Sequence, residues 1–160
     1  HDALPIRSEE RRVGKECTGY EHYEISNFAL PGWRSRHNSS YWSGKHYLGI
    51  GPSAHSFNGT TRQWNIANNN LYIESVQAGK VPFEKEQLTS TQQLNEYIMT
   101  ALRTSEGIDV NKLNKVEADS ILQKSKRYLE AALIKQENHH LILTREGKLL
   151  ADGIAAALFF

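Results

Sequence analysis

Apolar residues in the second half of the chain recur three and four positions apart. Two segments, 94–102 and 121–133, show this period. The spacing places the apolar side chains on one face of a helix, so we expect two amphipathic helices that pack together. A short strand at 139–144 and a last helix at 145–158 complete a module of the winged-helix kind. The residues predicted to face inward from the last helix are Leu149, Leu150, Ile154, Ala157 and Leu158.

The first half of the chain has a different character. Residues 19–28 alternate in the manner of a strand. Residues 33–70 are rich in Gly, Ser, Asn and aromatic residues, which predicts loops with one short strand at 47–50. Loops on a rigid scaffold are a common place for functional sites. The segment 81–87, VPFEKEQ, has no period, and we place the boundary between the two halves there.

Composition limits the chemistry that this chain can supply. It has 160 residues, a net charge of +1 and one cysteine, Cys17. A single thiol excludes a disulfide within the chain and any zinc or iron–sulfur site with several cysteines from this chain. The small net charge gives no long-range attraction to nucleic acid or to an anionic membrane. No apolar run approaches the roughly eighteen residues of a membrane span, so we expect a soluble, cytoplasmic protein.

A winged-helix-like module raises the question of DNA binding. The candidate recognition helix, 121–136, has as basic residues Lys124, Lys126, Arg127 and Lys135. Two acidic residues, Glu130 and Glu137, lie in this segment or directly after it. The basic patch is therefore modest, and we predict no nucleic-acid partner.

Residues 37–42 read HNSSYW. A neutral imidazole at His37 could ligate a metal or the iron of a haem group. Tyr41 and Trp42 could supply flat apolar faces against a macrocycle. A surface or hydrogen-bonding role for His37 is the alternative, and the residues alone leave both interpretations open.

A second candidate segment, GIGPSAH, covers residues 49–55. Gly49 and Gly51 allow the backbone to come close to a ligand because no side chain intervenes. Pro52 has no amide to donate, which argues against a dinucleotide fingerprint. A tight turn is the other interpretation, and His55 is either exposed to a ligand or held by the serines beside it.

Other polar residues give weaker signals. His22 and Glu24 lie two apart on the predicted strand, so a carboxylate could orient the imidazole as an acid/base pair, or both could be ordinary polar positions of one face. The arginines that could bind carboxylates or phosphates are Arg34, Arg36 and Arg62, and a solvated basic loop is the alternative. His139 and His140 are adjacent in a strand and point to opposite faces, which disfavours chelation of one ion.

Several phrases of the sequence occur together in one known family. They are YEISNFA (23–29), SRHNSSYW (35–42), YLGIGPSAHSF (47–57), RQWN (62–65), LT (88–89) and LTREGKLLAD (143–152). Because these phrases occur in the family's order and approximate spacing, the chain resembles the C-terminal part of the radical-SAM haem chaperone HemW family. That family is closely related to the oxygen-independent coproporphyrinogen III oxidases.

The resemblance implies an α/β fold class, in which the C-terminal fragment of a partial radical-SAM TIM-like barrel precedes a small helical winged-helix-like domain. Residues 18–84 would be the last strands and loops of the barrel, and 85–160 the HemN-type C-terminal domain. Residues 1–17 have dense mixed charge and do not match the family. We interpret them as a charged arm with a foreign or misread start.

The resemblance also concerns cofactors. Family members hold a [4Fe–4S] cluster through a C-x-x-x-C-x-x-C loop and bind S-adenosylmethionine at its open iron. This chain has one cysteine, so we expect it to ligate neither group and to have no radical activity alone.

The family's H-N-x-x-Y-W signature is associated with haem binding, which makes His37 the best candidate for an iron ligand. A histidine at position 55 is typical of the chaperone branch, because the oxidase branch has an aliphatic residue there. The haem-binding set that the resemblance implies is His37, Asn38, Tyr41, Trp42, Gly49, Gly51 and His55.

We therefore expect part of a haem chaperone that binds haem and transfers it to an acceptor protein, with the membrane as one location of that acceptor. Two alternatives stay open. One is a coproporphyrinogen III oxidase-type enzyme of porphyrin biosynthesis, in which Arg34, Arg36 or Arg62 pairs with propionates. The other is a protein-interaction module in the helical domain.

Overall fold

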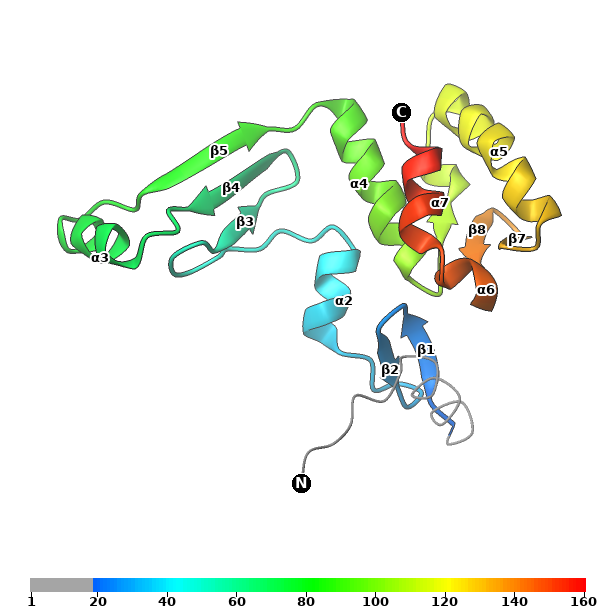
Figure 1. Cartoon of the computed structure of the whole chain (residues 1–160), viewed down its shortest axis with the longest axis horizontal. Helices are drawn as coiled ribbons and strands as arrows, with labels where there is room; N and C mark the ends of the chain where they lie inside the picture. Colours follow the sequence, from blue (N-terminus) through cyan, green and yellow to red (C-terminus); the bar gives the residue numbers. More distant parts are fainter. Residues whose placement is uncertain (1–18) are drawn as a thin grey trace. The chain divides into compact units, whose positions relative to one another are not determined.

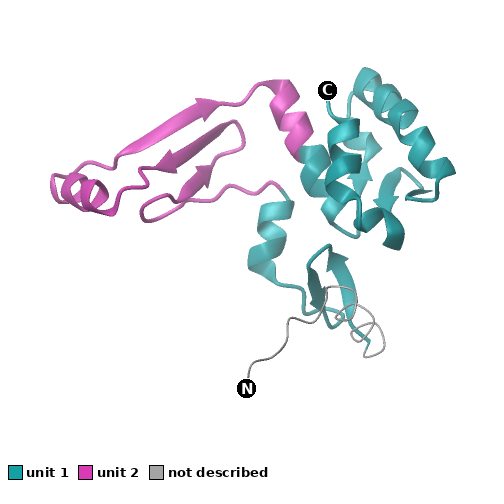
Figure 2. Cartoon of the chain, viewed as in Figure 1, with its two compact units in different colours: residues 1–43, 97–160 teal, residues 44–96 magenta. Residues whose placement is uncertain are grey.

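The computed structural model describes residues 19–160, so the predicted charged arm at 1–17 lies outside the described residues. This part of the chain is a mixed α/β structure (Figure 1). It consists of two compact units, shown in different colours in Figure 2. The described part of the first unit is 19–43 with 97–160, and the second unit is 44–96.

The first unit begins with a β-hairpin. β1 (Glu21–Glu24) and β2 (Asn27–Ala29) pair antiparallel, and their register shifts between His22 and Glu24. A turn follows, in which the Trp33 N–H donates to the Leu30 carbonyl at 2.9 Å and Gly32 has a φ of 81°. This turn, at Pro31-Gly32, leads into α2 (Arg36–Trp42), drawn in cyan in Figure 1.

The remainder of the first unit is a helical layer with a small sheet. α4 (Ser90–Arg103) enters it at Tyr97 and is followed by β6 (Ile108–Asp109), a 3₁₀ turn and α5 (Lys115–Glu130). β7 (Ile134–Glu137), β8 (His140–Leu143), α6 (Arg145–Lys148) and α7 (Ala151–Leu158) complete it. The strands form an antiparallel sheet in the order β6-β8-β7. The largest fully buried apolar side chains of its core are Ile98, Leu102, Ile108, Ile121, Ile134, Leu141, Ile154 and Leu158.

The second unit is a three-stranded antiparallel sheet with one complete helix and the first part of α4, up to Glu96. The sheet order is β3 (His55–Phe57), β4 (Thr61–Asn65) and β5 (Phe83–Gln87). α3 (Asn69–Gln77) lies between β4 and β5 in sequence, and the Asn68 side chain caps it by accepting from the Leu71 N–H. Leu88, directly after β5, is buried.

The two central helical predictions are confirmed in α4 and α5. Ile98, Ala101 and Leu102 are buried on α4, and Ile121 is buried on α5. The second prediction extends too far, because α5 ends at Glu130 and residues 134–137 form a strand. Ala132 has a φ of 54°, which turns the chain out of the helix before β7 pairs with β8.

The predicted helix at 145–158 is divided into α6 and α7. Leu150 has a φ of −115° and a ψ of 16°, outside the helical region, so the period does not continue across it. Leu149 and Leu150 are 57% and 54% exposed, and their predicted inward orientation is wrong. Ile154 and Leu158 are buried as predicted, which places the core contacts of this region in α7.

The second unit differs from the sequence expectation at two places. The segment 81–87, placed at the boundary because it has no period, contains β5, which is stabilised by pairing with β4. The segment 47–50 forms no strand, only an isolated bridge between Tyr47 and Phe57. The division at 84–85, the partial barrel and the winged-helix assignment stay predictions.

Candidate functional site

Helix α2 contains the whole HNSSYW phrase, which was predicted to be a loop. The Ser35 side chain caps it by accepting from the Asn38 N–H at 3.2 Å. At its other end the Ser43 N–H donates to the Ser39 carbonyl at 3.1 Å. A helix of seven residues is too short to show an apolar period, so local capping, and not a stripe, defines it.

The helix separates the motif into two faces. Successive residues turn by about 100°, so positions 36, 37, 40 and 41 lie on one side and positions 38 and 42 on the other. His37 is exposed and Tyr41 is 43% exposed. Their rings are 5.1 Å apart and perpendicular, with an interplanar angle of 89°. His37 and Tyr41 therefore form one aromatic pair on the outward face of α2.

The inward face is fixed by a chain of polar contacts. The Asn38 amide donates to Oδ1 of Asn27 at 3.2 Å, and the Asn27 amide donates to Oε2 of Glu24. The other carboxylate oxygen of Glu24 accepts from Nε of Arg103 at 3.0 Å. Glu24 is only 1% exposed, so its charge depends on these donors. Asn38 consequently joins α2 to both the hairpin and α4.

Trp42 lies on the same inward side. The Arg103 guanidinium lies over its ring at 5.1 Å from the centroid, a cation–π arrangement. Its Nε1 atom is buried and has no hydrogen-bond partner among the residues that the structure describes. Trp42 was predicted to face a macrocycle; here one of its faces contacts Arg103 instead.

Arg34, predicted to bind an anionic ligand, is occupied by two carboxylates. Its Nε atom donates to Glu21 at 3.1 Å and its Nη1 atom donates to Glu106. The hydrogen bond to Glu106 is the main influence that raises the pKa of Arg34 above its ordinary value. Burial would raise the pKa of Glu106, but its bond to Arg34 and its other interactions outweigh burial and lower that pKa. The pair is an internal contact of the first unit.

Gly49 of the GIGPSAH segment allows a close approach within the chain itself. A Cβ atom on Gly49 would lie 2.2 Å from the His55 carbonyl oxygen. The Asn65 amide donates to the Gly51 carbonyl at 2.9 Å, and the Gly51 N–H donates to the Tyr72 hydroxyl at 3.3 Å. The segment is thus folded against β3, β4 and α3 of the second unit.

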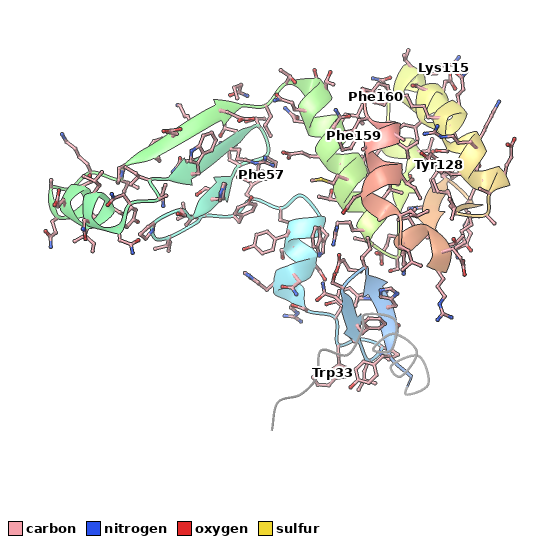
Figure 3. All side chains as sticks on the ribbon, in the orientation of Figure 1. Trp33, Phe57, Lys115, Tyr128, Phe159 and Phe160 are labelled. Carbon is pink, nitrogen blue, oxygen red and sulfur yellow. The ribbon has the colours of Figure 1, made fainter. Side chains whose placement is uncertain are left out.

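His55 is the last residue of this segment and the first residue of β3. It is exposed, and its ring lies 6.4 Å from that of Trp64, its partner across the strand pair. Phe57, at the other end of β3, is labelled in Figure 3. His55, Gly49 and Gly51 belong to the second unit, whereas His37, Asn38, Tyr41 and Trp42 belong to the first.

The predicted pair of His22 and Glu24 does not form. The register shift between these two residues interrupts the alternation that would place them on one face. His22 stacks on Phe28 with ring centroids 4.2 Å apart, and its Nε2 contacts the Ile25 carbonyl at 2.9 Å. Its Nδ1 atom lies 3.2 Å from Nζ of Lys148. The structure therefore gives His22 a packing role instead of an acid/base one.

Asn27 and Arg103 belong to this site, although no sequence pattern indicates either of them. Asn27 stands in the YEISNFA phrase, which was noted only for its resemblance to the family. Arg103 ends a predicted helix, where a basic side chain is ordinary. Their roles depend on contacts between segments far apart in sequence, which no local pattern contains.

The donor groups of the chain limit which cofactor it can hold. Within residues 19–160, no three or more His, Cys, Asp or Glu side chains are grouped so that they could hold a metal ion. The single cysteine of the chain does not fit a cluster that needs three thiolates. A haem group requires less from the protein, since one imidazole can serve as the axial ligand of its iron. Of the groups that the resemblance implies, haem therefore fits the described residues, through the outward-facing imidazole of His37.

Comparison with known proteins defines the class to which this architecture belongs. Residues 88–150 match the family model of the HemN C-terminal domain. The fold is similar to that of a solved structure, coproporphyrinogen III oxidase (HemN) from Escherichia coli, described as a radical SAM enzyme. The TM-score is 0.69 over 94% of this chain and 39% of that one, at 16% sequence identity. The fold is thus that of the C-terminal region of a HemN-like protein.

Sequence relatives narrow the assignment. The chain is 32% identical over 158 residues to haem chaperone HemW of Mycobacterium tuberculosis. The matched region covers 98% of this chain and 40% of the relative. The chain is 33% identical over 147 residues to HemW of Bacillus subtilis, covering 89% of this chain and 39% of the relative. The chain belongs to the HemW and HemN family and corresponds to its C-terminal part, as the sequence motifs predicted. It spans about 40% of the length of these relatives.

Proposed function

We propose that this chain contributes a haem-binding surface to a haem chaperone and that His37 ligates the haem iron. The observation that supports this most is the outward position of the His37–Tyr41 pair on α2. Within the described part of the chain, no hydrogen bond engages the His37 ring, in contrast to the ring of His22. An imidazole with a free nitrogen on an exposed face is what an external iron centre requires.

The geometry of Tyr41 supports the same proposal. A ligating imidazole stands upright on the porphyrin plane, because its nitrogen points at the iron. A ring perpendicular to that imidazole can lie parallel to the porphyrin and contact it face to face. The angle of 89° between the two rings is compatible with this arrangement. Tyr41 would then add apolar contact beside the iron–nitrogen bond.

The role of a chaperone follows from the same exposure. A haem held from one side by an exposed histidine keeps its other axial position open to a ligand from an acceptor protein. The curated relatives are named haem chaperones, which supports release to an acceptor as the function. The proposal places this protein in the cytoplasm. It includes the membrane surface as one place where haem is transferred to the acceptor. None of the described helices is both long and apolar enough to cross a membrane.

Haemin titration of the full chain tests the proposal. The His37→Ala variant should bind haemin at least about tenfold more weakly and show a shifted Soret maximum, because the iron–nitrogen bond is lost. His139→Ala is the control, since His139 is also exposed in the first unit and no described residue engages its ring. A His55→Ala arm tests the second candidate histidine. Identical spectra and affinities for His37→Ala and the unmodified chain would refute His37 as the ligand.

A further inference from the structure

Arg36 shares the outward face of α2 with His37 and Tyr41. We propose that its guanidinium binds a carboxylate of the tetrapyrrole, so that the ligand class is a porphyrin with free propionate groups. The proposal rests on the proposed function, because it assumes a porphyrin held at His37. It goes further by assigning the residue that recognises the edge of the ring.

Arg36 differs from the other arginines near the two candidate segments in having no described partner. Arg34 is bonded to Glu21 and Glu106, and Arg103 is bonded to Glu24. Arg62 in the second unit is paired with Glu96. Arg36 is exposed, and no ion pair or hydrogen bond connects its guanidinium to any of residues 19–160. Of the three arginines considered as propionate ligands, it is the one whose charge is available.

The surroundings of Arg36 favour an anion. The sequence of α2, RHNSSYW, contains no acidic residue that would neutralise the guanidinium within the helix. The Asn38 N–H is already bonded to the Ser35 side chain, so the proposed contact is made by the side chain and not by helix amides. The Ser40 hydroxyl donates to the Arg36 carbonyl at 2.8 Å, which helps to hold the backbone from which the side chain extends.

The chemistry of the two groups is complementary. A guanidinium stays protonated and presents parallel N–H donors that match the two oxygens of a carboxylate. In haem the iron lies at the centre of the ring and the propionates lie at one edge. His37 and Arg36 are neighbours on the helix, so one can contact the centre while the longer side chain reaches the edge.

Two ligands distinguish the contact between Arg36 and a propionate from ligation of the iron by His37. Haemin and haemin dimethyl ester, whose carboxylates are neutralised, are titrated into the full chain and into Arg36→Gln. We expect Arg36→Gln to bind haemin about threefold to tenfold more weakly, the range for a lost charged hydrogen bond at a surface. Its affinity for the ester should equal that of the unmodified chain, and its Soret maximum should not move because His37 is retained.

Arg145→Gln is the matched control. Arg145 is also the first residue of a short capped helix in the first unit, is exposed and has no described partner. It should leave both affinities unchanged. Equal haemin affinity for Arg36→Gln and the unmodified chain would overturn the proposal, and so would an equal loss for haemin and its ester. If His37→Ala alters the Soret spectrum and Arg36→Gln alters neither affinity, only this inference fails; if His37→Ala alters nothing, the proposed function itself fails.

Discussion

Glu24 is a buried carboxylate on which three segments of the first unit converge. It binds Arg103 from α4, the Asn27 amide and the Ser26 N–H, the last at 2.9 Å. Asn38 of α2 reaches it through Asn27. Asn38 and Trp42 lie about one helical turn apart in α2, so both face inward. The inward half of the motif holds the helix, and the outward half is left for a ligand.

Removing Arg103 tests this network. Arg103→Gln leaves Glu24 charged and buried without its cationic partner, so the free energy of unfolding should fall by about 3–5 kcal/mol. Arg62→Gln is the control, because the Arg62–Glu96 pair is more exposed and should contribute about 1 kcal/mol or less. Urea denaturation followed by circular dichroism measures both. Equal losses for the two variants would show that Glu24 does not depend on Arg103.

The Arg34–Glu106 pair predicts an acid-dependent loss of stability. The folded-state pKa of Glu106 lies below its ordinary value, so the pair stabilises the fold above the unfolded pKa, about 4.3. This contribution is lost as the pH falls through the folded pKa. Glu106→Gln should therefore flatten the decline of the unfolding free energy between about pH 5 and pH 3.

Denaturant titrations across this pH range measure the effect. Glu84→Gln serves as a control, since Glu84 is exposed on β5 and no described side chain pairs with it. A decline in Glu106→Gln as steep as in the unmodified chain would contradict the pairing seen in the structure.

At the scale of elements, periodicity predicted α4 and α5 because their cores repeat over several turns. The shorter elements were missed for a physical reason. β5 and β7 exist through pairing with β4 and β8, and α2 exists through its caps, so none has a local pattern long enough to detect. The register shift in the first hairpin likewise places Glu24 inside, although its position in the alternation predicted a polar face.

Replacing two glycines by alanine should change the free energy of unfolding in opposite directions. Gly49→Ala would place a Cβ atom against the His55 backbone, so the free energy of unfolding should fall by roughly 1–3 kcal/mol. Gly153 lies inside α7 with open space where its Cβ would be, so Gly153→Ala should raise that energy by about 0.5–1 kcal/mol. Thermal and urea unfolding of both variants measures the difference. If Gly49→Ala left the free energy of unfolding unchanged, the GIGPSAH segment would be loosely packed against His55.

At the scale of the whole molecule, the resemblance predicted the family correctly, while residue patterns alone did not reach it. The site residues were named from motifs, but the motifs did not reveal that Asn38 and Trp42 face inward or that Arg34 is already paired. The C-terminal end of the chain also has a contact that local sequence patterns do not predict. Phe160, labelled in Figure 3, contacts Lys124 of α5 at 4.4 Å from its ring centroid, and this contact joins residues that no local pattern connects.

The central claim is that the imidazole at position 37 bonds directly to the haem iron. Imidazole rescue tests it most directly: the His37→Ala chain is mixed with haemin, and its Soret spectrum is recorded with and without free imidazole. We predict that the variant lacks the spectrum of the unmodified complex and that added imidazole restores it. A variant whose spectrum already matches that of the unmodified chain before imidazole is added would contradict the claim.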